Sequence, residues 1–86
     1  MLRLWAKVLF KDKIVKQYTL EKNERLDFSH FYTYITDICN ELDIPTPIVL
    51  KTHVSQFRSF HHVKFVPGDF VDSVWFDKLW IENISE

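Results

Sequence analysis

The first 20 residues alternate between two kinds of side chain with the two-residue period of β-strands. In residues 2–10 the even positions are all apolar, whereas the odd positions are mixed: Arg3, Trp5, Lys7 and Leu9. Residues 14–20 alternate in the same way, and the polar residues 11–13 separate the two runs. This pattern predicts a β-hairpin with the even positions of its first strand facing the core.

Between residues 28 and 42 the apolar positions recur every three or four residues, which is the spacing of one helix face. Asp27 stands before this stripe as a good N-cap, because its carboxylate accepts from the free N–H groups of a first turn. Pro45 disfavours a helical residue before it, so we predict that the helix ends near Asp43.

The dipeptide Thr46-Pro47 is typical of a second helix start, with an N-cap followed by proline in the first helical position. Apolar residues follow at helical spacing, which predicts a helix over residues 47–59. Three good strand formers begin at Ile48, so a strand over residues 48–54 is the alternative.

The last part of the chain returns to strand alternation, first in residues 61–66 and then in residues 74–84, where Leu79 and Ile81 lie opposite Trp80. The order is therefore strand, strand, helix, helix, strand, strand. It predicts one α+β domain over residues 1–86, with a mostly antiparallel four-stranded sheet packed by two helices. Such a sheet buries one face and leaves the other in water.

Composition excludes several classes of function but identifies none. The 86 residues are 47% apolar and 27% charged, as in an ordinary folded domain. A single glycine rules out glycine-rich phosphate loops, and a single cysteine rules out disulfide frameworks and cysteine zinc clusters within one chain. No apolar run approaches the roughly 18 residues of a membrane span. We expect a cytoplasmic protein that needs no cofactor and binds no membrane.

Charge is distributed unevenly along the chain. Residues 1–26 hold seven Lys and Arg against three Asp and Glu, a net +4, whereas residues 27–86 hold four against nine, a net −5. The basic hairpin either docks a partner or simply complements the acidic remainder on one small surface. With a formal charge of −1 the whole chain is not a generic nucleic-acid binder.

Candidate catalytic and metal-binding groups lack supporting motifs. The four histidines lack the spacings of zinc ligands, although a site from His53, one of His61 and His62, and Asp69 stays geometrically open. Cys39 falls in a helix pattern beside acids, which disfavours a reactive thiolate. An acidic segment near aromatic residues has the pattern of a solvated loop. Its acids are Asp69, Asp72 and Asp77. We predict that the protein is not an enzyme and holds no metal.

Protein interaction is the function with most support. If the sheet turns its apolar positions to the core, the tryptophans Trp5 and Trp80 fall on the other face and mark a docking or dimer surface. We predict an interaction module or homodimer that uses Trp5, Trp80, Arg3, Lys7 and Lys16. The alternative interpretation is that the tryptophans belong to the core.

A second functional hypothesis is weak binding of single-stranded nucleic acid. The basic hairpin interleaves cations with an aromatic, as single-strand binders do. The cations involved are Arg3, Lys7, Lys11, Lys13 and Lys16. The acidic second half makes nucleic acid the less favoured partner.

Three segments of the second half carry a family resemblance: Asp43 to Ile48, Phe65 to Asp69, and Phe76 to Leu79. In these segments the chain resembles small uncharacterised bacterial proteins. The resemblance implies a bacterial cytoplasmic domain of unknown function, and it brings no catalytic motif and no functional residues.

Overall fold

The chain begins with the long hairpin that its alternation predicts. A computed structural model describes residues 1–85, and in it strands β1 (Leu2–Phe10) and β2 (Lys13–Lys22) pair antiparallel. The connecting residues Lys11 and Asp12 both have positive φ, 51° and 63°, which is the signature of a type I′ turn. The register shifts at Val8 and Leu9, so a β-bulge bends β2 near the turn.

The first helical segment also follows the prediction. A 3₁₀ turn, η1 (Phe28–His30), leads into α1 (Phe31–Leu42). The Asp27 carboxylate accepts from the Ser29 backbone N–H at 2.9 Å and from the Ser29 hydroxyl at 2.7 Å, and these bonds lower the pKa of Asp27. Asp43 ends α1 in the left-handed conformation.

The second helix begins later than predicted. α2 runs over Lys51–Phe60, so the predicted start at Thr46-Pro47 is wrong, and so is the alternative strand over residues 48–54. Residues 44–50 stay outside helix and strand because another residue caps α2: the ring of His53 accepts from the Leu50 N–H at 2.9 Å.

Strands β3 (His62–Phe65) and β4 (Lys78–Asn83) complete the sheet, with a 3₁₀ turn η2 (Pro67–Asp69) between them. The strand order is β2-β1-β4-β3, and every neighbouring pair is antiparallel. The predicted α+β class, the four-stranded antiparallel sheet and the ββααββ order are confirmed.

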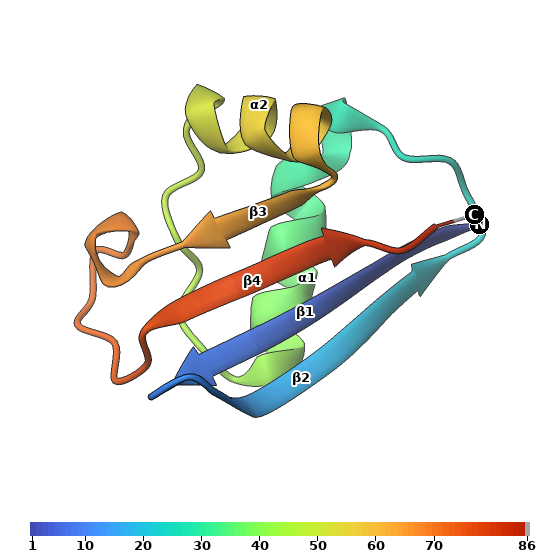
Figure 1. The fold of residues 1–86 in the computed structure, drawn as a ribbon. Coiled ribbons are helices and arrows are strands. Elements are labelled where there is room, and N and C mark those ends of the chain that lie inside the picture. The colour runs from blue at the N-terminus through green and yellow to red at the C-terminus, as the bar shows by residue number, and fades with distance from the viewer. Residues whose placement is uncertain (86) are drawn as a thin grey trace.

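The two helices occupy different positions on the sheet (Figure 1). α1 lies across one face, behind β1 and β4 in that view, while α2 lies alongside β3 at the end of the strand order. Side chains from both helices close the core, where Phe31 and Phe57 pack with ring centroids 5.2 Å apart. The face of the sheet under α1 supplies the strand side of the core: Leu2, Leu4, Ala6, Val8, Leu20, Val63, Phe65, Leu79 and Ile81.

Candidate interaction surface

The face of the sheet opposite α1, called the open face below, is crossed by no helix of residues 1–85 (Figure 1). Strand register brings residues from all four strands together on it. Trp5 pairs with Thr19 and Glu82, Lys7 pairs with Gln17 and Trp80, and Trp80 pairs with Lys64. The structure thus places Trp5, Leu9 and Trp80 opposite the core-facing side chains, as the alternation predicted. All three are half-buried.

Lys7 lies at the centre of the open face. Its Nζ is 3.9 Å from the ring centroid of Trp5, 5.5 Å from that of Trp80, and 3.6 Å from Glu82 Oε1. Only 14% of the side chain is exposed. A cation held between two indole faces and a carboxylate is stabilised by cation–π attraction and by its ion pair. Lys7 therefore joins the two tryptophans rather than reaching into solvent.

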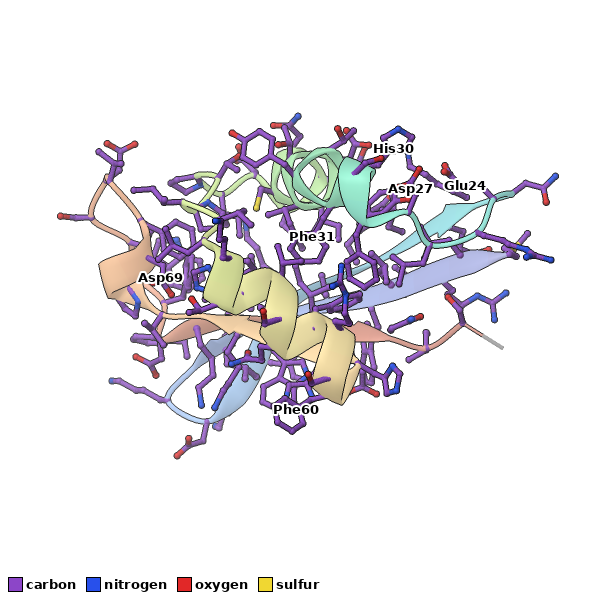
Figure 2. The ribbon with its side chains drawn as sticks, turned by 90° about the horizontal axis from the view of Figure 1, so that it is seen from above. Glu24, Asp27, His30, Phe31, Phe60 and Asp69 are labelled. Carbon is purple, nitrogen blue, oxygen red and sulfur yellow. The ribbon has the colours of Figure 1, made fainter. Side chains whose placement is uncertain are left out.

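Aromatic rings continue the arrangement toward α2. His62 stacks on Trp80 with centroids 4.5 Å apart and an interplanar angle of 15°. Phe60, at the end of α2, lies 6.1 Å from His62 and is 65% exposed. Figure 2 shows Phe60 directed away from α1, whereas Phe31 points into the space below α1. These contacts form a continuous cation–aromatic row, defined as Trp5, Lys7, Trp80, His62 and Phe60.

The two indole N–H groups of this row differ in their partners. Trp5 Nε1 donates to Gln17 Oε1 at 3.0 Å. Trp80 Nε1 is buried and has no acceptor among residues 1–85. A buried donor without an acceptor costs about 1–3 kcal/mol. The row therefore contains one polar group that packing covers without satisfying it.

The two remaining predicted site residues, Arg3 and Lys16, lie on different faces of the sheet. Arg3 lies on the open face, where its guanidinium is 3.8 Å from Glu21 Oε2. Lys16 does not lie on this face: it pairs with core-facing Val8, and its Nζ donates to the Leu42 carbonyl at 2.9 Å. The placement of Lys16 with the other cations was wrong because Lys16 shares the parity of Tyr18, which pairs with buried Ala6 and packs against the core.

Three lysines of the basic hairpin contact the rest of the chain. Lys7 contacts Glu82, Lys22 lies 3.3 Å from Asp37, and Lys16 binds the last turn of α1. These contacts link the two oppositely charged parts of the sequence within one molecule. They agree with the interpretation that the two halves complement each other.

The candidate metal site from the sequence comes together only in part. His53 Nε2 lies 3.4 Å from Asp69 Oδ2, but His62 belongs to the open face and stacks on Trp80. The His53 ring is buried against Phe65, and its Nδ1 already accepts from the Leu50 N–H. Since Asp69 Oδ2 also accepts from the Val66 N–H at 2.9 Å, the pair joins the start of α2 to η2.

The other candidate groups also have structural partners. Asp77 Oδ2 accepts from the Lys11 N–H at 2.7 Å and so holds the hairpin turn against the start of β4. Burial raises the pKa of the Cys39 thiol to about 12, which keeps it protonated at neutral pH. His30, Asp27 and Glu24 lie at one exposed corner of the molecule (Figure 2).

Residues 1–85 hold neither a cluster of metal ligands nor a helix able to span a membrane. Within residues 1–85, no three or more His, Cys, Asp and Glu side chains are placed to hold a metal ion together. Over the same residues, neither helix has the length and apolar character needed to cross a bilayer.

Comparison of the chain with family models, curated proteins and solved structures finds no match in any of the three. The resemblance to small uncharacterised bacterial proteins therefore stays a prediction.

Sequence reasoning missed two of the five residues of the cation–aromatic row, His62 and Phe60. His62 and Phe60 join it because β3 pairs with β4 in a register that opposes Lys64 to Trp80. The alternation of His62 and Lys64 shows that they share a face of β3, but not which strand lies beside them. That information depends on a pairing between distant segments.

Proposed function

We propose that this protein is a non-enzymatic interaction module that binds a protein partner on the open face of its sheet. The observation that carries the proposal is the cation–aromatic row, which lies on the face without a covering helix while α1 covers the other. Tryptophan and phenylalanine are enriched in protein interfaces, and the row brings Trp5, Trp80 and Phe60 together on one face.

The geometry favours a protein partner over a nucleic acid. A base would need a free ring face for stacking, yet Lys7 covers Trp5, and His62 lies flat on Trp80. The cations Arg3 and Lys7 already contact Glu21 and Glu82, so few are left for phosphates. Single-stranded nucleic acid therefore remains the second candidate, supported only by the cations themselves.

The side chains with catalytic potential support a binding role rather than an enzymatic one. Both ring nitrogens of His53 face partners inside the protein, Asp77 holds a turn, and Cys39 is buried and protonated. The single buried cysteine and the resemblance to bacterial proteins make the bacterial cytoplasm the compartment that we propose.

The test is an affinity capture from bacterial lysate with the tagged wild type and two variants, Phe60→Ala and Lys64→Glu. Both positions are exposed: Phe60 is the end of the row nearest α2, and Lys64 pairs with Trp80 beside the row. Tyr32→Ala is the matched control, because Tyr32 is an exposed aromatic, 59% accessible, on α1 at the other side of the sheet. Each capture is run with and without nuclease and at about 0.5 M salt, where phosphate contacts weaken steeply.

The expected result is a protein that binds the wild type and the Tyr32→Ala variant, survives nuclease and salt, and is lost with both open-face variants. Equal capture by all four chains would contradict the open face as the docking surface. Material that disappears with nuclease and salt would favour the nucleic-acid hypothesis instead.

A further inference from the structure

The two edges of the sheet differ in how their outward backbone groups are satisfied. At the β3 edge the Lys64 N–H donates to Gln56 Oε1 of α2 at 2.9 Å, and just beyond the strand the Val66 N–H donates to Asp69 Oδ2 at 2.9 Å. α2 lies alongside this edge (Figure 1). Side chains and a helix therefore close β3 to any further strand.

The β2 edge is open, and strand register shows which groups it presents. Arg3 and Leu9 accept through their carbonyls from Ile84 and Asp77 on the β4 side, so the odd residues of β1 face β4 and its even residues face β2. Even residues of β1 pair with even residues of β2 between Leu2 and Val8. The odd residues of β2 beyond the bulge therefore point their N–H and C=O groups outward: Gln17, Thr19 and Glu21.

These outward groups have no internal partner. Among residues 1–85, neither a backbone group nor a side chain hydrogen-bonds the main chain of Gln17, Thr19 or Glu21. Lysine side chains often guard such an edge. Beyond the bulge, both β2 lysines are held elsewhere, because Lys16 binds the Leu42 carbonyl and Lys22 contacts Asp37, both on α1. The edge is available to a further strand.

We propose that the occupant of this edge is β2 of a second copy of the same chain, paired antiparallel about a two-fold axis at Thr19. In that register Thr19 faces its own symmetry mate, and Gln17 faces Glu21 of the other copy. The three outward residues beyond the bulge are then paired in each strand.

The side chains are compatible with this register. On the open face the Gln17 amide faces a carboxylate that can accept from it. On the α1 side Tyr18 faces Leu20, which is an apolar pair. Lys16 faces Lys22, the one like-charge pair, but Lys22 already has Asp37 at 3.3 Å to neutralise it.

Self-pairing also explains why one open edge is tolerated. Since the β3 edge is closed, two chains that join through β2 leave no free edge for a third chain, and the assembly stops at a dimer. Antiparallel strands are related by a two-fold axis perpendicular to the sheet, so both open faces lie on the same side. This proposal does not depend on the open face binding a partner.

The first experiment is sedimentation equilibrium of the wild type from micromolar to millimolar concentration, combined with amide hydrogen exchange measured by NMR at both ends of that range. We expect a reversible dimer, with the amides of Gln17, Thr19 and Glu21 protected only at high concentration. A chain that stays monomeric at millimolar concentration overturns the proposal. A dimer in which these amides still exchange rapidly overturns it as well.

Variants test the edge and its register. Thr19→Pro removes an outward N–H without touching the β1 ladder and should abolish the dimer, while Thr19→Val keeps the N–H and should preserve it. Gln17→Glu retains an acceptor for Trp5 but opposes two carboxylates twice per dimer, so it should weaken dimerisation about fivefold. Adding Glu21→Lys to that variant should restore it. A dimer indifferent to all of these changes would use another surface.

Discussion

The two faces of the sheet carry large side chains from the same strands, but they bury them by different means. On the covered face Leu79 and Ile81 are 0% exposed and pack with apolar residues. On the open face Trp80 stands between them in sequence and packs against His62 and Lys7. The covered face packs apolar side chains together, whereas the open face encloses the charge of Lys7 between Trp5, Trp80 and Glu82. The covered face therefore depends on apolar packing, and the open face on cation–π and stacking contacts.

The largest expected effect is on the reactivity of the Cys39 thiol, which lies on the covered side of the sheet. With a pKa of about 12 instead of 9.0, native Cys39 holds about a thousandfold less thiolate than the unfolded chain near pH 8. A coloured thiol reagent should therefore react slowly with the native protein and rapidly in urea. Comparable rates in the two states would show that water reaches this side of the sheet.

The same shift has a consequence for stability at alkaline pH. Between pH 9.0 and about 12 the folded state keeps a proton that the unfolded thiol has lost. The free energy of unfolding therefore falls as the pH rises through this window. Cys39→Ala should make that decline shallower in urea titrations, whereas an identical decline would assign it to other groups.

Substitutions at two neighbouring residues of β4, one on each face, compare what the two faces contribute to the free energy of unfolding. Leu79→Ala removes a fully buried side chain and should lower the free energy of unfolding by about 3 kcal/mol. Trp80→Ala should cost about 1–2 kcal/mol although its side chain is larger, since Trp80 is only half-buried. Urea unfolding measures both values. The comparison fails if Trp80→Ala is the more damaging change.

Local pattern was sufficient for the features that depend on residues near each other in sequence. Strand parity placed Leu79 inward and Trp80 outward, and the stripe from Phe28 to Leu42 located α1. Distant contacts explain the failures. α2 begins at Lys51 because the His53 ring caps it, a role that no N-cap preference anticipates.

In the candidate site, too, local pattern predicted the face on which a residue lies but not its neighbours from distant segments. Parity in β1 and β4 brought Trp5, Lys7 and Trp80 to one face, as the alternation indicated. His62 and Phe60 joined them through the pairing of β3 with β4, which sequence alone does not give. For the same reason the α1 carbonyl that holds Lys16 was not foreseen.

A smaller effect is expected from the cation at the centre of the row. Lys7→Met keeps the aliphatic stem but removes the charge over Trp5 and opposite Glu82, so the free energy of unfolding should fall by about 1 kcal/mol. Lys13→Met, at an exposed position beside the turn, is the control and should have little effect. If Lys7→Met were as stable as the wild type, the cation would contribute nothing to the open face.

The smallest effect concerns the buried donor. Trp80→Phe removes an indole N–H that has no acceptor among residues 1–85, so the lost ring area and the relieved donor should nearly cancel. We expect a change within about 0.5 kcal/mol by urea unfolding. A loss near that of Trp80→Ala would show that an acceptor, such as an ordered water, satisfies this group in solution.

The position of β1 in the strand order has a consequence for synthesis on the ribosome. β1 is central, with β2 on one side and β4 on the other, and 67 residues separate Phe10 from Lys78. At about 5–20 residues per second, roughly 3–13 s pass between the emergence of the two strands. During that interval β1 has its hairpin partner but lacks its second neighbour. Nascent chains are therefore most exposed to mispairing along this inner strand, and chaperone demand should fall once β4 has left the exit tunnel.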